Sequence, residues 1–88
     1  MKQFEFTVKD VLGLHARPAG LLVSEAQKYE SDITLTVARS GKSVSLKKLL
    51  AVMGLGVKGG DAVSVTVNGS DEAAAAEAIE RWMRENLG

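Results

Sequence analysis

The sequence has no cysteine and only one histidine and one proline among its 88 residues. Without cysteine there is no disulfide framework and no thiolate metal site, so a hydrophobic core must hold the chain without covalent links. A single histidine offers no cluster of ligands for a transition metal. We therefore expect no metal and no cofactor, and the absence of cysteine fits a reducing cytoplasm.

An excess of charge of one sign is also missing, because 11 basic and 11 acidic side chains give a net charge of +0. No general attraction to nucleic acid or to anionic lipid is expected. No segment approaches the ~20 apolar residues of a membrane span, and Glu5 stands where a signal peptide would have an apolar run. We expect a cytoplasmic protein that neither binds nucleic acid nor inserts into a membrane.

Hydrophobic residues make up 45% of the chain and charged residues 25%, which is typical of a globular protein. A chain of this length has room for one hydrophobic core, so we expect one domain over residues 1–88. The small size and balanced charge favour a monomer.

Apolar and polar side chains alternate in four segments, which is the pattern of strands with one buried face. These segments are residues 2–8, 33–37, 43–46 and 62–68. The intervening residues 39–42, Arg-Ser-Gly-Lys, predict a hairpin turn between the second and third strands.

Three other segments have the period of helices. The first begins at Ala16 and has Pro18 in its first turn, where proline is tolerated. A short helix is predicted over residues 46–55. A last helix is predicted to be capped by Ser70. Its first turn carries Asp71 and Glu72. The apolar stripes are Ala19, Leu22, Val23, Ala26 and Tyr29 in the first helix, and Ala75, Ile79, Trp82 and Met83 in the last.

The predicted order is strand, helix, strand, strand, helix, strand, helix. This order predicts an α+β fold, in which three helices cover one face of a four-stranded antiparallel sheet and the other face meets water.

His15 lies where the first loop becomes the first helix. The first amides of a helix have no internal partner and the helix dipole is positive there, so an anion is stabilised at this place. A phosphoryl group on the imidazole would meet the amides of Ala16 and Arg17, and the Arg17 guanidinium offers a planar, charged fork. A neutral imidazole is also a nucleophile at cell pH. These features favour a phosphoryl carrier, although His15 as a plain helix cap and Arg17 as a solvated side chain fit the pattern too. Gly13 would let the backbone of a partner approach closely.

The face of the first helix opposite its apolar stripe carries Arg17, Gly20, Leu21, Ser24 and Lys28, so Leu21 is expected to be exposed near His15. The short second helix holds Leu49, Leu50, Val52 and Met53, which are more apolar residues than one narrow stripe buries. If Leu50 or Met53 faces outward, an apolar docking patch surrounds the histidine. The alternative is that all of these residues belong to the core.

The segment Gly-Leu-His-Ala-Arg-Pro-Ala at residues 13–19 resembles the active-site segment of HPr, the histidine-containing phosphocarrier family of the bacterial sugar phosphotransferase system. The resemblance extends through residues 41–43 and 53–56 to essentially the whole chain. It implies an open-faced β-sandwich in which enzyme I, drawing on phosphoenolpyruvate, phosphorylates His15 at Nδ1, and sugar-specific subunits then take the phosphoryl group. It also implies that Arg17 contacts the phosphate and that the apolar patch receives both partners.

Two positions depart from the family pattern. Lys48 stands where many Gram-positive members have a regulatory serine, so regulation by a serine kinase is in doubt. Leu12 replaces a small polar residue that can bond to the imidazole, so backbone or water would have to orient the ring of His15.

Two other functions fit the sequence. The first is an HPr-like relay protein in a nitrogen-type or other non-sugar pathway, which Leu12 and Lys48 make possible. The second is a binding module that performs no phosphoryl transfer. Independent catalysis is not expected, because no second acid or base stands at a defined spacing from His15.

Overall fold

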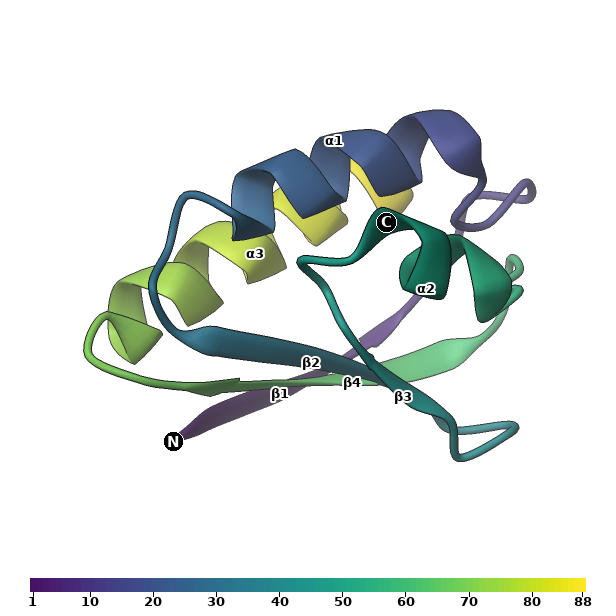
Figure 1. Cartoon of the computed structure of the whole chain (residues 1–88). Coiled ribbons are helices and arrows are strands. Elements are labelled where there is room, and N and C mark those ends of the chain that lie inside the picture. The colour runs from purple at the N-terminus through teal and green to yellow at the C-terminus, as the bar shows by residue number, and fades with distance from the viewer.

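The structure is a computed structural model that describes residues 1–88. The strands and helices follow one another along the chain in the order that the sequence predicts (Figure 1). The elements are β1 (Lys2–Thr7), α1 (Ala16–Ala26), β2 (Asp32–Val37), β3 (Ser43–Ser45), α2 (Leu49–Gly54), β4 (Ala62–Asn68) and α3 (Glu72–Leu87).

The four strands form one antiparallel sheet in the order β1-β4-β2-β3. Val65 of β4 lies at its centre and faces Phe4 of β1 on one side and Leu35 of β2 on the other. Because side chains alternate between the two faces of a strand, this register puts the apolar residues of all four strands on one face. The opposite face carries mainly threonine, serine and other polar side chains.

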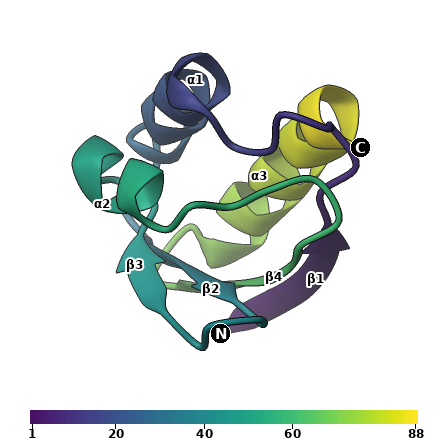
Figure 2. The same cartoon turned by 90° about the vertical axis from the view of Figure 1, so that its right-hand side faces the viewer.

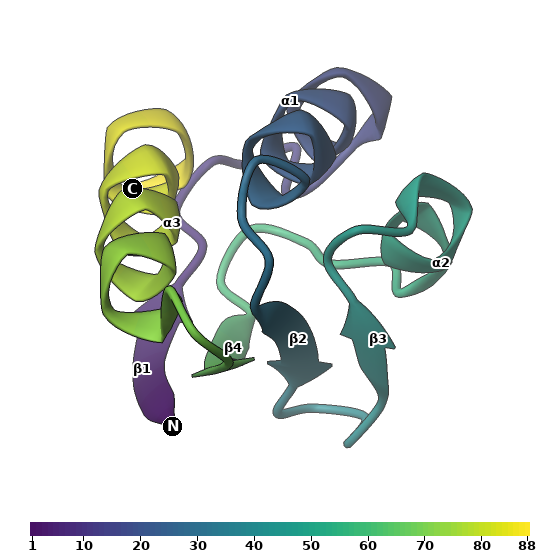
Figure 3. The ribbon, with the colours of Figure 1, turned by 60° about the vertical axis from the view of Figure 1, so that its left-hand side comes forward.

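All three helices lie on the apolar face of the sheet, and the other face is uncovered (Figure 3). The helices and this face enclose a single core cluster of 20 buried residues. The fold is therefore the α+β, open-faced arrangement that the sequence predicts. No helix combines the length and the apolar character needed to cross a membrane.

The second helix is shorter than the sequence predicts, because it begins at Leu49 and not at Leu46. Leu46 is fully buried, and its amide donates to the carbonyl of Ile33 at 2.8 Å. This bond continues the pairing of β3 with β2 for one more residue. The periodicity alone could not distinguish this extended, buried leucine from the first residue of a helix.

The prediction that Ser70 caps the last helix is wrong. Asp71 is the residue before α3, and its side chain does not bond to the helix. The Asp71 carboxylate instead accepts hydrogen bonds from the hydroxyl of Ser31 and from the amides of Glu30 and Ser31. These bonds, led by that of the Ser31 hydroxyl, lower the pKa of Asp71. The carboxylate thereby ties the start of α3 to the turn before β2.

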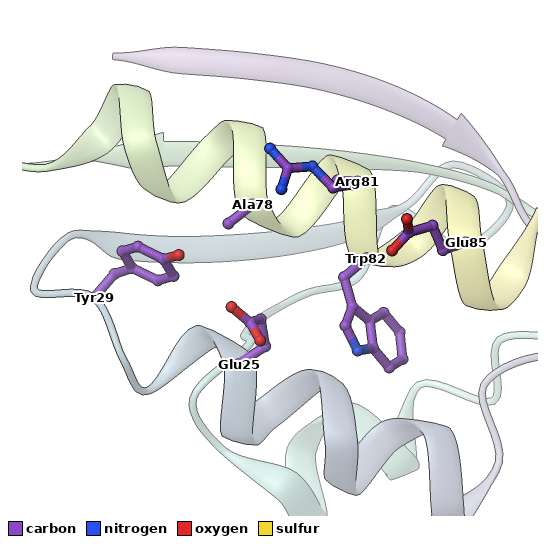
Figure 4. A pocket seen from close by; sticks show the side chains of 6 residues that line it. All are labelled: Glu25, Tyr29, Ala78, Arg81, Trp82 and Glu85. Carbon is purple, nitrogen blue, oxygen red and sulfur yellow. The ribbon is translucent and has the colours of Figure 1, made fainter.

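The apolar stripes of the helices also differ slightly from those expected. Trp82 is only half-buried, and Leu87 is the fully buried residue that continues the stripe of α3. Tyr29 lies beyond the end of α1 and is half-buried. A shallow hollow of about 240 Å³ separates these two aromatic side chains, with Glu25, Ala78, Arg81 and Glu85 completing its lining (Figure 4).

Candidate functional site: the start of the first helix

His15 is the residue that precedes α1, as the sequence predicts. Its backbone is extended, with φ −86° and ψ −175°, and its carbonyl accepts the amide of Ala19 at 2.9 Å. The backbone of His15 thus caps the helix, while its side chain makes no cap hydrogen bond and is exposed. The imidazole is therefore open to another molecule.

The amides that follow His15 are free to bind an anion. The amides of Ala16 and Arg17 lie in the first turn of α1, where no earlier helical carbonyl is available to accept them. Pro18 has no N–H, and the first turn contains no acidic residue. Two unpaired donors and the positive end of the helix dipole thus lie next to the histidine.

The side chain of Arg17 is exposed and takes part in no ion pair or hydrogen bond within the chain. A guanidinium has five N–H donors in a fixed planar arrangement that matches phosphate oxygens. Arg17 therefore keeps its full bonding capacity two residues from the imidazole.

The loop before His15 packs against the segment between α2 and β4, and Figure 2 shows the two passing close to each other. The amide of Leu14 donates to the carbonyl of Val57 at 3.0 Å. Gly13 is buried and has φ +65°, and a Cβ at this position would lie only 2.3 Å from the Val57 oxygen. The expectation that Gly13 admits the backbone of a partner is therefore wrong, because the chain's own backbone occupies that space.

The end of α3 holds the same loop from another side. The carbonyl of Leu87 accepts the amides of Lys9 and Asp10 at 2.7 and 3.2 Å. The Asp10 carboxylate in turn accepts the amide of Leu12 at 2.9 Å. The segment that carries His15 is thus fixed by backbone bonds to two distant parts of the chain.

Two apolar side chains of this loop face water. Val11 is 89% exposed and Leu12 is 68% exposed. Val11 is not among the predicted site residues, although two adjacent apolar residues in the loop beside the histidine were a usable signal. The side chain of Leu12 forms no hydrogen bond, so it does not orient the imidazole in the way that a polar residue can.

A second group of apolar side chains lies exposed on α1 and α2, which contact each other. Leu21 is 53% exposed and Leu50 is 83% exposed, whereas Val52 is buried in the core. We call the exposed face of these two helices the α1/α2 surface. Its predicted members are Gly20, Leu21, Ser24, Leu49, Leu50 and Met53, of which all but the half-buried Gly20 are exposed.

Lys48 immediately precedes α2 and is exposed, with extended backbone and no cap hydrogen bond. It thus occupies the start of the second helix, the position at which many Gram-positive members of the family that the sequence resembles have a regulatory serine. Lysine has no hydroxyl, so this position has no acceptor for a serine kinase.

The residues around the hollow between α1 and α3 include none of the predicted site residues. The histidine lies at the surface, in a segment held by backbone bonds to distant parts of the chain, next to free amides and a free guanidinium. This arrangement is that of a group-carrying protein, whose reactive side chain must be reached by one partner and then by another.

The comparisons with known proteins agree with this class. The sequence profile described as "PTS HPr component phosphorylation site" matches residues 2–85. The phosphocarrier protein HPr of Mycoplasma genitalium is 40% identical over 86 residues, which cover 98% of this chain and 97% of that protein. The chain belongs to the HPr family of phosphocarrier proteins.

Solved structures show the same fold. A histidine-containing phosphocarrier protein from Mycoplasma superposes with a TM-score of 0.89 at 34% identity, over 96% of this chain and 93% of that one. An HPr dimer from Thermoanaerobacter tengcongensis superposes with a TM-score of 0.76 at 35% identity, over 100% and 99% of the two chains. The protein is thus a phosphocarrier that receives and passes on phosphoryl groups in a phosphotransferase relay.

Proposed function

We propose that His15 is the residue that carries the phosphoryl group. Enzyme I, charged from phosphoenolpyruvate, is the donor, and sugar-specific subunits of the phosphotransferase system are the acceptors. The observation that carries this proposal is the exposed imidazole beside the two unpaired amides of Ala16 and Arg17. It is the only histidine of the chain.

In the transfer, the lone pair of an unprotonated ring nitrogen of His15 attacks the phosphorus atom. The new P–N bond forms as the bond between phosphorus and the donor breaks, and the electron pair of that bond returns to the donor. The phosphoryl group on the ring carries about −1.5 to −2 charges. The amides of Ala16 and Arg17 and the Arg17 guanidinium stabilise this charge.

The α1/α2 surface is the place where both partners dock in turn. Leu21 and Leu50 supply apolar contact area. The small side chains of Gly20 and Ser24 leave room for a partner to approach His15. Since one surface serves two partners, the phosphorylated chain must leave enzyme I before it meets a sugar-specific subunit. The chain acts as a shuttled intermediate and not as an enzyme with its own substrate pocket.

Residues 1–88 act as one domain, in the cytoplasm, as a monomer. The single core cluster supports one domain, and the small size and balanced charge favour a monomer. Two similar chains have been solved as dimers, so light scattering of the purified chain is the direct check. A mass of one chain at micromolar concentration is the expected result.

A second candidate function is a relay in a nitrogen-type or other non-sugar pathway. The exposed Leu12 in the His15 loop and Lys48 at the start of α2 make it possible, because both residues depart from the pattern of the sugar-system family. Exchange of phosphoryl groups with each enzyme I and each acceptor of the same cell separates the two functions.

The test is incubation with phosphoenolpyruvate and enzyme I, followed by addition of sugar-specific acceptors. We expect the chain to gain one acid-labile phosphoryl group and to lose it to an acceptor. A chain that stays unmodified under these conditions would be a binding module or would serve another donor.

A further inference from the structure

We propose that Arg39 and Asp61 form a clasp that positions the loop carrying His15, so that Arg39 is a positioning residue for phosphoryl transfer. The inference rests on the proposed role of His15. Neither Arg39 nor Asp61 is part of the α1/α2 surface or of the first turn of α1.

The clasp consists of three hydrogen bonds from one guanidinium. Nε of Arg39 donates to Oδ1 of Asp61 at 3.1 Å, and Nη2 donates to Oδ2 at 3.0 Å. Nη2 also donates to the carbonyl of Gly56 at 3.3 Å. Arg39 comes from the turn between β2 and β3, so it ties that hairpin to both ends of the segment 56–61.

The side chain of Asp61 also bonds to the backbone of this segment. Its Oδ2 also accepts the amide of Lys58 at 2.9 Å. The bond from Arg39, followed by that from the Lys58 amide, lowers the pKa of Asp61 to about 2. The carboxylate therefore stays ionised at neutral pH and keeps both bonds. Gly56 and Gly60 have φ of +66° and +92°, a region that glycine enters at little cost. The side-chain bonds of Asp61 therefore add to the backbone bonds of the segment, such as that from the Gly60 amide to the carbonyl of Val8 at 2.6 Å, in fixing its shape.

The segment 56–61 is the support of the His15 loop. The carbonyl of Val57 accepts the amide of Leu14, the residue before His15, at 3.0 Å. Gly13 and Gly59 also mark close packing, because a Cβ on Gly59 would lie 2.7 Å from the carbonyl oxygen of Asp10. A shift of the segment therefore moves the backbone that precedes the histidine.

Phosphoryl transfer depends strongly on position, since a misplacement of 1 Å can cost ~100-fold in rate. The clasp acts on the residue next to His15 through two links: guanidinium to segment, and segment to the Leu14 amide. Because the side chain of Arg39 is exposed, its ion pair with Asp61 is expected to contribute little to the stability of the chain. Its effect is expected on the position of the His15 loop instead.

The experiment compares Arg39→Gln with Arg81→Gln in the full chain. Arg81 is a matched control, since its side chain is 57% exposed against 55% for Arg39 and bonds to one carboxylate, Glu77, on α3. The rate of phosphoryl uptake is measured at saturating phosphorylated enzyme I. Hydrogen exchange of the Leu14 amide is measured by NMR, together with the urea midpoint.

We expect Arg39→Gln to lower the rate at saturating donor about 10-fold and to speed exchange at Leu14 about 10-fold. Arg81→Gln leaves both within about 2-fold. Asp61→Asn should lower the rate similarly, and the double variant should be no slower than either single one, because both remove the same clasp. A pair with only a structural role would shift the urea midpoint and leave the rate of the folded chain unchanged.

The inference is overturned if Arg39→Gln takes up phosphoryl at the wild-type rate, or if the effects of the two clasp substitutions on the rate simply multiply. Failure of the wild-type chain to accept phosphoryl contradicts the proposed function instead. In that case the exchange at Leu14 still decides whether the clasp holds the loop.

Discussion

At the scale of single residues, the proposed phosphate contact rests on the guanidinium of Arg17, which has no partner within the chain. Hydrogen bonds to charged groups are worth about 1.5–3 kcal/mol. We predict that Arg17→Ala lowers the rate of phosphoryl uptake by about 10- to 150-fold, as these energies imply. Arg17→Lys should be intermediate, because it keeps the charge and loses the planar fork. Stopped-flow measurement with phosphorylated enzyme I checks this, and equal rates for all three chains would contradict it.

Substitution by alanine should have opposite effects on stability at Gly13 and at Gly20. Gly13→Ala puts a Cβ 2.3 Å from the Val57 oxygen at a φ of +65°, which should destabilise the chain by at least about 2 kcal/mol. Gly20 lies within α1, and a Cβ there meets nothing within 4 Å. Gly20→Ala should therefore stabilise the chain by about 0.5–1 kcal/mol. Urea unfolding of both variants tests the account, and a similar loss of stability in both would contradict it.

The position of His15, Ala16 and Arg17 at a helix start was predictable, because Pro18 and the apolar period mark where the helix begins. The role of Gly13 was not predictable. Its close neighbour is Val57, more than 40 positions away, and no local pattern reports which backbone packs against a glycine.

At the scale of elements, α2 presents one side chain to the core and others to water. Leu50 is 83% exposed and Val52 is 1% exposed. We predict that Leu50→Asn raises the KM for phosphorylated enzyme I by about 10-fold and changes stability by less than about 0.5 kcal/mol. Val52→Ala should instead destabilise the chain by ~2 kcal/mol and leave KM unchanged while the chain is folded.

Steady-state kinetics and urea unfolding on the same preparations separate these effects. A Leu50→Asn chain with the wild-type KM would remove α2 from the docking surface.

The strands were predictable from the alternation of apolar and polar residues, and their order in the sheet follows only from the structure. The start of α2 was misplaced because Leu46 pairs with Ile33 of β2. The Ser70 cap was wrong because Asp71 bonds across to Ser31. In both cases a contact between segments distant in sequence determines where a helix begins. Local helix propensity gives no information about such a contact.

At the scale of the whole molecule, ionised carboxylates join distant segments, as between Arg39 and Asp61. The pKa of Asp61 is lowered from 3.8 to about 2. A group whose pKa is lower in the folded state stabilises that state above its unfolded pKa, and this contribution disappears as the pH falls through the folded pKa. The pKa of Glu72 is also lowered from its ordinary value of 4.5, chiefly by its bond with the N-terminal amine. We therefore predict a constant urea midpoint down to about pH 5, followed by a fall towards about pH 2.

Asp61→Asn should have a lower midpoint at neutral pH and a shallower fall in acid, because one of the titrating carboxylates is gone. An acid slope equal to that of the wild type would show that the ion pair does not contribute.

The central claim is that the phosphoryl group resides on the imidazole of His15. The most direct measurement is tandem mass spectrometry, at neutral pH, of the chain after incubation with enzyme I and phosphoenolpyruvate, repeated after acid treatment and with His15→Gln. We predict one phosphoryl group on His15, its loss in acid, and no modification of the folded His15→Gln chain. A phosphoryl group on another residue, or one retained in His15→Gln, would contradict the account.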